Sequence, residues 1–413
     1  MSTPDDAGCS AGSISPGRRP AVHRLLRRVL RHLLKGILLL GGATILFHIV
    51  IPPVYRFPPP RPFAGPFWYN PYASPSGRWL RANFHAHTRT WKSFINQEAS
   101  AENLKSIYRG LGYDITGISN YQDIEPPGPA DDLYIPGYEH GYGLNQQHQT
   151  VLGASSVAWL DYPLYQDLSQ KQDVIDRLSA DGVVVVLNHP NKNNAYPPED
   201  LESLTGYTGI EVGSRFAAGL PQWEAALRAG RPVWGFCADD GHKLEWPAYL
   251  EVGWVMIDAD ERSPAAVVQS LKTGRFYSVW AKNMKHTIRL ISCTIDGNRL
   301  SVACSDPVDF IFFISKNRLV KQVVNQATAF YDLQDQDPYV RVEFATWNTT
   351  LYLNPVFRQT EPQIPGRPPQ GPRVEVVAAM TWTRRGAALL ALLLLAIRLY
   401  GKPAGGRAAG AGA

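Results

Sequence analysis

Histidines are concentrated in one part of this 413-residue chain, and their order constrains the fold more than any other feature. Six of the ten histidines lie between positions 85 and 242. With nearby carboxylates they follow predicted strands in the order His85, His87, Glu139, His148, His189, Asp240 and His242. Side chains at the carboxyl ends of successive strands meet at one edge of a sheet or barrel. The pattern therefore predicts a metal site assembled from segments far apart in the sequence.

The H-x-H pair His85 and His87 comes at the end of a predicted strand, Trp79 to Phe84. Strand side chains alternate between two faces, so both imidazoles lie on one face and can chelate a single ion. Imidazole with carboxylate is the ligand set of zinc, manganese or iron at open catalytic sites, whereas closed zinc sites usually use thiolates. The four cysteines lack C-x-x-C spacing, which favours a catalytic ion.

An apolar segment near the N-terminus predicts a transmembrane helix at residues 33–55. Its centre, residues 36–51, lacks Asp, Glu, Lys and Arg, and its flanks bring it to the roughly 20 residues that a spanning helix needs. The basic tail, residues 1–32, is expected in the cytoplasm, which leaves the remainder periplasmic or extracellular. A cleaved signal peptide is the alternative, but Pro52 and Pro53 follow in place of small residues.

The mildly positive net charge of the chain comes largely from one segment. Much of the net charge of +5 comes from the arginines and the lysine beside the apolar segment, so no nucleic-acid partner is expected. The predicted partners are the membrane and a small-molecule substrate.

Proline-rich and apolar segments flank the central region. Residues 56–78 form a proline-rich linker that either acts as a spacer or packs against the domain. Residues 361–385 are a second linker. An apolar helix is predicted at residues 386–400, about 18 Å long over its apolar part, and either a short membrane span or an interfacial helix fits. Residues 401–413 are predicted to be disordered.

Between the linkers, predicted strands and helices alternate. Helices are expected at residues 98–111, 168–180, 198–204, 221–229 and 264–271, and strands at 115–119, 150–154, 183–187, 209–212, 233–237 and 252–257. β-branched runs such as that at residues 183–187 are typical of parallel strands buried on both faces. The order predicts an α/β barrel over residues 79–285, with its active site at the carboxyl ends of the strands.

After about residue 285 the pattern changes to alternating strands, which predicts a small antiparallel β domain at residues 286–360. A turn at Asp296, Gly297 and Asn298 joins its first two strands as a hairpin. Cys293 and Cys304 lie on these strands. Either a disulfide across the hairpin or two buried free thiols is consistent with the sequence.

The motifs RANFHAHT, GYDITGISN, YIPGYEH, HQTVLGA, VVLNHPN and GFCADDGH resemble, in order and spacing, those of the PHP (polymerase and histidinol phosphatase) superfamily. Residues 253–280 and 352–357 resemble the barrel end and the closing strand of PHP metallohydrolases that carry a β-sandwich. This resemblance covers roughly residues 78–360. It implies a distorted (β/α)7 barrel followed by a β-sandwich-like domain.

The resemblance also implies the ligand set. His85, His87, Glu139 and Asp240 would hold one divalent ion, and His148 and His189, with Glu139 bridging, a second. His242 would belong to a third site or face the substrate. The family's usual T-D-H is here Ser119-Asn120-Tyr121, and a phenol is a poor ligand unless it is deprotonated. A two-metal site is therefore expected, and His140 is a weak substitute because neighbouring strand residues point to opposite faces.

Catalytic roles follow from the chemistry of two neighbouring cations. Tyr121 or His242 is expected to protonate a leaving oxygen, and Arg275 and Lys192 are candidates for gripping an anionic substrate, with structural roles as the alternative. Asp239 is expected to position Asp240.

The predicted function is that of a membrane-anchored metal-dependent hydrolase, first of all a phosphoesterase using a metal-activated water. Cleavage of an ester, amide or carbamate bond is the second hypothesis. A catalytically inactive, metal-stabilised binding domain is the third.

Overall fold

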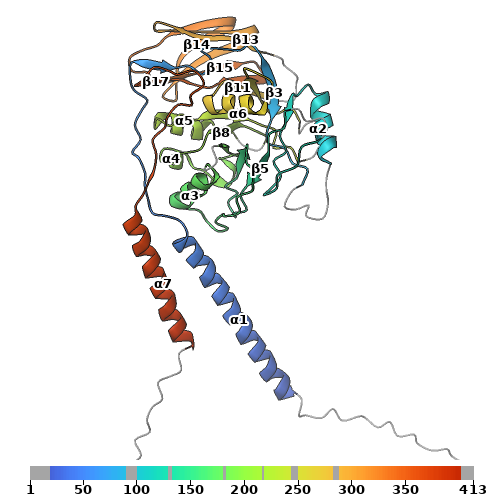
Figure 1. The fold of residues 1–413 in the computed structure, drawn as a ribbon, viewed down its shortest axis with the longest axis vertical. Helices are drawn as coiled ribbons and strands as arrows, with labels where there is room; N and C mark the ends of the chain where they lie inside the picture. Colours follow the sequence, from blue (N-terminus) through green and yellow to red (C-terminus); the bar gives the residue numbers. More distant parts are fainter. Residues whose placement is uncertain are drawn as a thin grey trace, which may run out of the picture. The chain divides into compact units, whose positions relative to one another are not determined.

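The computed structural model describes residues 19–89, 100–128, 133–179, 183–215, 218–242, 250–281 and 288–400 (Figure 1). These residues divide into two units. One contains residues 19–52 and 379–400, and the other contains residues 53–378. The predicted disordered tail, residues 401–413, lies outside the described residues.

The first unit contains two long helices, α1 (Arg19–Val50) and α7 (Ala378–Tyr400). Both are long and apolar enough to cross a membrane, with candidate spans at His23–Val50 and Ala378–Leu395. α1 begins earlier than the predicted residue 33, so part of the basic segment is helical. α7 begins earlier than the predicted residue 386, and its 23 residues span about 35 Å, enough for a hydrocarbon core of about 30 Å.

The carboxyl end of α1 is capped by side chains of α7. Arg385 donates from Nε to the carbonyl of Val50 at 2.8 Å and from a terminal nitrogen to that of Ile51 at 2.9 Å, and Arg384 binds the carbonyl of Pro52. Carbonyls at a helix end lack partners within the helix. These two arginines therefore satisfy groups that would otherwise need water.

The described residues of the second unit form two main sheets and five α-helices. The larger sheet runs in the order β12 (Leu290–Asp296), β13 (Arg299–Ser315), β15 (Tyr339–Ala345), β16 (Thr349–Leu353), β11 (Phe276–Ala281), β10 (Gly253–Asp258), β3 (Trp79–Asn83) and β4 (Ile115–Thr116). Beside this row, β14 (Arg318–Asp332) pairs with β13 and β17 (Val356–Gln359) pairs with β15, and β2 (Phe67–Tyr69) pairs with β17. The smaller sheet runs in the order β5 (Gly137–His140), β6 (Gln149–Leu152), β7 (Val184–Leu187), β8 (Gly209–Gly213) and β9 (Trp234–Cys237).

The helices are α2 (Ala101–Gly110), α3 (Leu168–Leu178), α4 (Pro198–Leu201), α5 (Leu220–Arg228) and α6 (Pro264–Thr273). Their ends follow local sequence signals. Asp167 and Gln170 form a reciprocal capping box at the start of α3. α6 begins after Ser263, whose side chain accepts from the amide of Ala266, and ends at Gly274 with φ +75°.

The predicted mixed α/β class is confirmed, whereas the distorted (β/α)7 barrel expected within it is not observed as a closed sheet among the described strands. The described strands form mixed, open sheets, in which β3–β4, β7–β8 and β8–β9 are parallel while β5–β6 and β6–β7 are antiparallel. The two sheets meet at isolated bridges, Ala86 with Gly241 and Tyr121 with Glu139. The loop between β5 and β6 contains no described helix, and so short a connection favours an antiparallel return.

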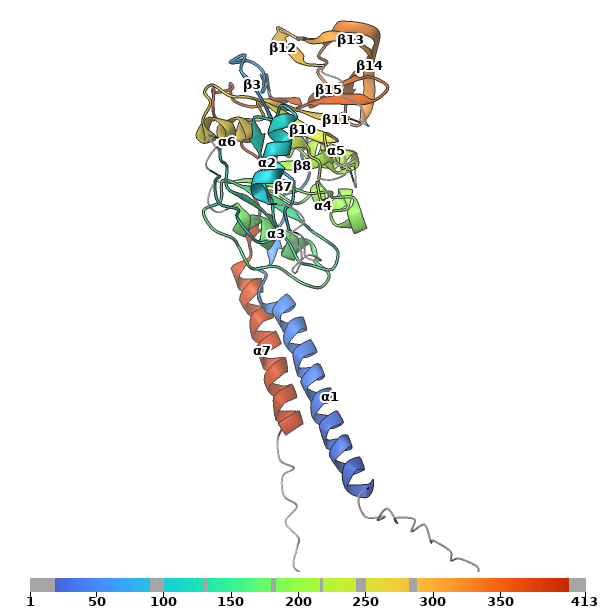
Figure 2. The same ribbon diagram turned by 90° about the vertical axis from the view of Figure 1, so that its right-hand side faces the viewer.

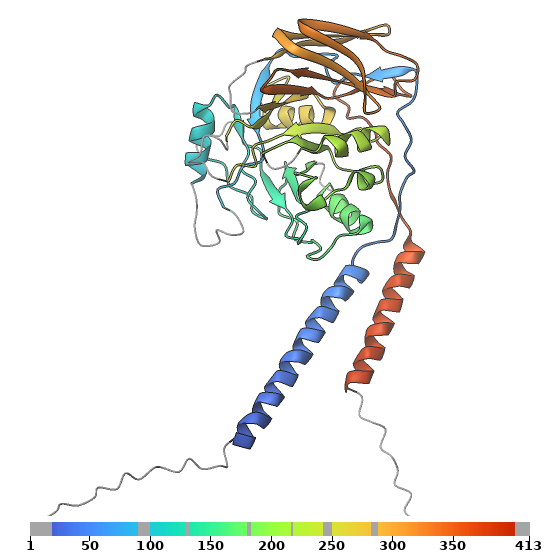
Figure 3. The ribbon, with the colours of Figure 1, turned by 180° about the vertical axis from the view of Figure 1, so that it is seen from behind.

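The predicted β region continues the sheet that contains β3. β11 pairs with both β10 and β16, so strands before and after residue 285 share one hydrogen-bonded row. The predicted boundary near residue 285 falls within residues 282–287, which lie outside the described residues. Figures 1 and 3 show β13, β14 and β15 at the end of this unit away from α3, and Figure 2 shows the same separation from the side.

The predicted hairpin joins β12 and β13 through Gly297 and Asn298. Cys293 lies opposite Val302, and Cys304 lies opposite Leu290. Both cysteines are buried free thiols, so the free-thiol alternative describes this hairpin.

The proline-rich linker is part of the second unit and packs against other segments of it. Tyr69 donates its hydroxyl to the carbonyl of Thr273 at 2.8 Å and stacks on Phe357 with ring centres 5.0 Å apart. Tyr72 is buried and donates to the carbonyl of Phe276. Of the two alternatives for this linker, the structure therefore shows packing around these residues.

Candidate metal centre

Two imidazoles enter the centre directly after β3. His85 and His87 are both buried, and Ala86 between them forms the bridge to Gly241. The Nε2 atom of His85 lies 3.3 Å from Oε1 of Glu139 and 3.3 Å from Oδ1 of Asp240. That of His87 lies 3.3 Å from Oε2 of Glu139. The alternation of side chains along the strand thus places both rings on the same pair of carboxylates.

Glu139, in β5, is the common neighbour of the histidines. It is fully buried, and its Oε1 lies 3.1 Å from Nδ1 of His148 and 3.5 Å from Nε2 of His189. His148 immediately precedes β6, and His189 follows β7. One carboxylate therefore faces four imidazoles that come from three segments of the chain.

Asp240 closes the centre after β9. Its Oδ1 lies 3.5 Å from Nε2 of His87 and 3.3 Å from Nδ1 of His242. The backbone φ of Asp240 is +48° and that of His189 is +28°, values that residues with side chains rarely adopt. Such conformations cost about 1–3 kcal/mol each and are concentrated at functional sites.

The buried donor atoms fit a metal ion. Among the described residues, Nε2 of His85, both ring nitrogens of His87, Nδ1 of His148, Oε2 of Glu139 and both carboxylate oxygens of Asp240 are buried without a hydrogen-bond partner. Four overlapping groups of three residues bring ligand atoms within 4.8 Å of one another. Buried polar atoms normally have partners, so this set of imidazole and carboxylate atoms fits divalent cations. Glu139 belongs to two of the groups.

Two positioning residues were missed by the sequence reasoning. One of them is Glu211, in β8. Its Oε1 lies 3.0 Å from Nδ1 of His85, and its other carboxylate oxygen accepts from the amide of His189 at 2.7 Å. Asn188 donates from Nδ2 to Oε1 of Glu139 at 2.9 Å. Carboxylates behind ligand histidines fix the ring orientation and the tautomer. A charged residue inside the apolar run of residues 209–213 was the available signal for Glu211.

Asp239 does not face the histidines. Its carboxylate accepts from the hydroxyl of Tyr108 at 2.7 Å, from Nδ2 of Asn83 at 2.9 Å and from the amides of residues 251–253. Burial raises the pKa of Asp239 to about 6, against these hydrogen bonds, which lower it. Asp239 thus connects its own segment, which also contains Asp240, to the end of β3.

The segment Ser119-Asn120-Tyr121 lies against the candidate centre. Asn120 Oδ1 accepts from the amides of Thr88 at 2.9 Å and Arg89 at 3.1 Å, which positions the chain after His87. The ring of Tyr121 stacks on that of His87 with centres 5.0 Å apart and an angle of 19°. Burial, and then Glu139 and Asp240, raise the pKa of Tyr121 far above its usual value, so the phenol stays protonated. It is therefore a hydrogen-bond donor to Glu139.

The other two histidines of this region behave differently. His242 is partly exposed, its Nδ1 lies 2.8 Å from the carbonyl of Asp240, and its ring centre lies 4.6 Å from that of His87. His140 is buried away from the centre, with Nδ1 on Oε1 of Gln149 and Nε2 on the carbonyl of Leu160. His242 alone of the two is placed to meet a substrate.

The prediction of a substrate contact required Arg275 to lie at this centre. The structure does not bring it there. Its guanidinium binds Asp258 at 2.9 Å and Asp260 at 2.7 and 2.8 Å, and two carboxylates leave it little capacity for another anion. Those contacts favour the structural alternative. Lys192 lies at the start of a short 3-10 helix, Lys192–Asn194, and is half-buried.

The charge states follow from burial and from these neighbours. Burial lowers the pKa of His87 to about 4 and also lowers that of His148. Burial also disfavours a charged His85, but Asp240, Glu139 and Glu211 outweigh it and raise the pKa of His85 well above its ordinary value. Despite burial, the surrounding imidazoles hold the pKa of Glu139 and of Asp240 well below the usual range. Both carboxylates are therefore ionised.

Comparison with known proteins adds distant structural similarity. The sequence matches no protein-family model, and no curated protein matches it significantly. A crystal structure from Bacteroides vulgatus, of a two-domain protein containing a predicted PHP-like metal-dependent phosphoesterase, is similar with a TM-score of 0.37 and 14% identity. The match covers 73% of this chain and 91% of that chain. A TM-score of this size does not establish a shared fold.

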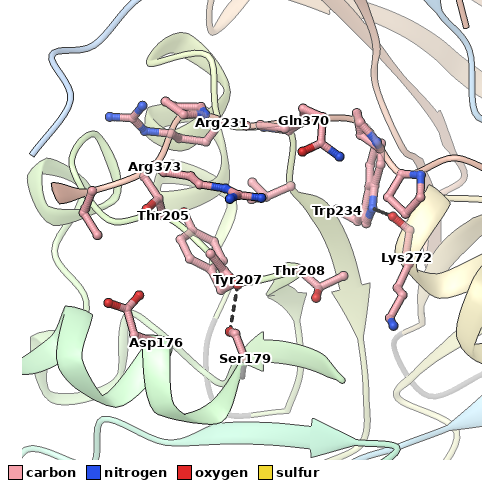
Figure 4. Close-up of a pocket in the computed structure, with 18 of the residues that line it drawn as sticks. Asp176, Ser179, Thr205, Tyr207, Thr208, Arg231, Trp234, Lys272, Gln370 and Arg373 are labelled. Carbon is pink, nitrogen blue, oxygen red and sulfur yellow. Dashed lines mark hydrogen bonds between the residues drawn. The ribbon is translucent and has the colours of Figure 1, made fainter. Parts of the chain in front are cut away.

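A separate cavity of about 490 Å³ lies away from the histidines, before the starts of β7, β8 and β9 (Figure 4). Its lining includes Arg231, Trp234, Lys272, Gln370 and Arg373, and none of the residues of the candidate metal centre. The segment 368–374 covers one side of it. This cavity has no part in the chemistry of the centre.

Proposed function

We propose that this protein is a membrane-anchored metal-dependent hydrolase, and specifically a phosphoesterase that holds two divalent ions. The observation that carries the proposal is the set of buried imidazole and carboxylate atoms around Glu139 that lack hydrogen-bond partners. His85, His87, Glu139 and Asp240 would hold one ion, and Glu139, His148 and His189 the other. The resemblance of these motifs to PHP metallohydrolases supports the same assignment. Zinc, manganese and iron all accept such ligands.

Bound divalent cations supply a water of lowered pKa and neutralise charge on the oxygens of the bond that breaks. The chain's own groups have distinct tasks. Glu211 orients His85, and Asn188 orients Glu139. Tyr121 keeps its proton and donates to Glu139. His242, partly exposed beside Asp240, would give a proton to the leaving oxygen.

The membrane anchor in this proposal is supported by the length and composition of α1 and α7. Arginines precede the apolar part of α1, which favours a cytoplasmic N-terminus and a periplasmic or extracellular second unit.

Metal analysis and a substrate panel test the proposal directly. The full chain in detergent should contain about two divalent ions, and it should hydrolyse phosphate esters faster than carboxyl esters, amides or carbamates. Asp240→Asn should lower metal affinity and turnover by about 100-fold, the upper end of the effect of partners that do not themselves bind the metal. Asp296→Asn, at the exposed hairpin turn, is the matched control and should change neither.

Two other results would redirect the assignment. Turnover of carboxyl esters or amides alone would favour the second class of hydrolase, since the same water can attack a carbonyl carbon. Bound metal with no turnover of any substrate class would favour a metal-stabilised binding domain.

A further inference from the structure

A group of large side chains is exposed on two neighbouring loops of the second unit. The loops are residues 141–148, between β5 and β6, and residues 155–166, before α3. The exposed fractions are 38% for Tyr142, 74% for Leu144, 66% for Trp159, 39% for Leu164 and 70% for Tyr165. We call these five residues the aromatic platform. Apolar side chains gathered in one place on a surface mark an interaction site more often than single ones do.

Hydrogen bonds hold the two loops together as one surface. The amide of Leu144 donates to the carbonyl of Pro163 at 3.0 Å, and the hydroxyl of Tyr142 donates to the carbonyl of Trp159 at 3.0 Å. The carboxylate of Asp161 accepts from the amides of Tyr142 at 2.7 Å and Gly143 at 3.2 Å. The platform is therefore a fixed feature of the fold.

The platform lacks exposed charge. Between residues 141 and 166 the sequence contains one residue of the types Asp, Glu, Lys and Arg, which is Asp161. This residue is fully buried and also accepts from Nε2 of Gln166 at 2.7 Å. A surface with aromatic and leucine side chains and no exposed charge can enter the headgroup layer of a bilayer without desolvating an ion.

The platform also lies near the points where the chain enters and leaves the second unit. Strand β1 (Tyr55–Arg56) pairs with β18 (Glu375–Val376), so entry and exit are side by side. Tyr55 is hydrogen-bonded to Asp176 in α3, and three residues earlier in α3 Asp173 accepts from the hydroxyl of Tyr162, in the second loop of the platform, at 2.6 Å. The platform is thus next to both connections.

Both connections lead directly to candidate membrane helices. Tyr55 lies five positions after the end of α1 at Val50, so chain length alone keeps the two within about 18 Å. α7 begins two residues after Val376. If these helices span a bilayer, its surface must lie close to β1 and β18 at any tilt of the helices.

From these observations we infer that the aromatic platform rests in the interfacial layer of the bilayer that holds α1 and α7. Tyrosine and tryptophan favour this layer because their rings are apolar and their polar groups reach water. The occupant is the lipid surface itself. The inference rests on the proposed membrane anchor, and it adds a second, peripheral contact through the domain that carries the metal centre. The loop that carries Leu144 ends at His148, a residue of the candidate metal centre.

Spin labels on the full chain in phosphatidylcholine vesicles test the inference. Labels are placed through Leu144→Cys, Trp159→Cys and Tyr165→Cys, one at a time, in a Cys9→Ser background, since Cys237, Cys293 and Cys304 are buried. Accessibility to oxygen relative to a water-soluble nickel chelate reports depth in the bilayer. We expect this ratio to be several-fold higher at the three platform positions than at Trp347→Cys. Trp347 is the matched control because it is 74% exposed and lies between β15 and β16.

A label at Leu40→Cys, in α1, separates failure of the inference from failure of the anchor. Lipid accessibility at Leu40 with water-like values at the platform would overturn the inference and leave the anchor in place. Such a result would instead favour a protein partner for the platform. Water-like values at Leu40 would overturn both. Metal content of each labelled variant, compared with the unlabelled chain, checks that the fold is kept.

Discussion

At the scale of single residues, the candidate centre depends on side chains that are not ligands as much as on those that are. Glu211 contacts both His85 and the backbone of His189. Asn120 holds the chain after His87, and Tyr121 stacks on that ring. The ligand types could be predicted from the sequence because imidazole and carboxylate have few alternatives as metal donors. Their supporting partners could not, because those contacts join distant segments.

We predict that Glu211→Gln lowers metal affinity by about 10- to 100-fold with the fold retained, because the His85 ring loses its anionic partner. Competition with a chromogenic chelator on the full chain in detergent measures this. Glu202→Gln, at an exposed carboxylate 3.2 Å from Arg228, is the control and should leave affinity unchanged. Equal affinity in the Glu211 variant and the unsubstituted protein would remove this residue from the centre.

Metal uptake should release protons near neutral pH. In the metal-free protein three carboxylates raise the pKa of His85 well above its ordinary value, whereas the pKa of His87 is lowered to about 4. His85 must lose a proton to coordinate, so apparent affinity should rise with pH. Calorimetric titration of zinc into chelator-treated protein, in buffers of different ionisation enthalpy, measures the protons released. Heats that do not depend on the buffer would contradict the assigned charge of His85.

The same shift predicts how the stability of the metal-free protein depends on pH. Because the folded pKa of His85 is raised, its stabilisation is fully present below the unfolded value of about 6.5 and is lost as pH rises through the folded value. The melting temperature of chelator-treated protein should therefore fall above about pH 7, and Glu211→Gln should reduce this dependence. A melting temperature that rises over this range would argue against the shift.

At the scale of elements, local signals located most helices and strands, but they did not reveal strand direction. The cap residues of α6, Ser263 and Gly274, are visible in the sequence and mark where that helix begins and ends. The reversal between β5 and β6 depends on pairing between strands, which no local period reports. The result is an open, mixed arrangement that still places Glu139 and His148 side by side.

The β5–β6 loop should be sensitive to a side chain at Gly141. This residue has a φ of +122°, and a Cβ there would lie 2.6 Å from the carbonyl oxygen of Gln147 and 2.8 Å from Cδ2 of His148. We expect Gly141→Ala to cost about 3 kcal/mol or more and to lower metal content by displacing His148.

Gly112→Ala is the matched control, because φ is +80° there and nothing lies within 4 Å of the added Cβ. It should cost only about 1 kcal/mol and leave metal content unchanged. Chemical unfolding and elemental analysis of both variants measure the difference. Similar effects of the two substitutions would show that contact with His148 is unimportant.

At the scale of the whole molecule, the chain enters and leaves the second unit at one place. β1 pairs with β18, and the exposed ion pair of Arg56 with Glu375, at 2.8 Å, lies across them. α1 ends just before this pair and α7 begins just after it. The two helices are therefore connected to a single edge of the domain.

If both helices span the membrane, both chain termini should lie on the side opposite the second unit. Reporter fusions that are active on only one side of the membrane, placed at each terminus, test this topology. The same signal from both termini is expected, because α7 is about 35 Å long and leaves from the same edge as α1 ends. A C-terminal reporter on the side of the domain would show instead that α7 lies in the interface.

The sequence by itself determined the kinds of ligand, the positions of most helices and strands, and the two apolar segments. These depend on the chemistry of individual side chains and on patterns within a few turns of chain. Only the tertiary structure decided that the sheets stay open, that Glu211 supports His85 and that Arg275 is held by Asp258 and Asp260. Each of those outcomes is a contact between segments far apart in sequence, and its free energy depends on burial and geometry that exist only after the chain has folded.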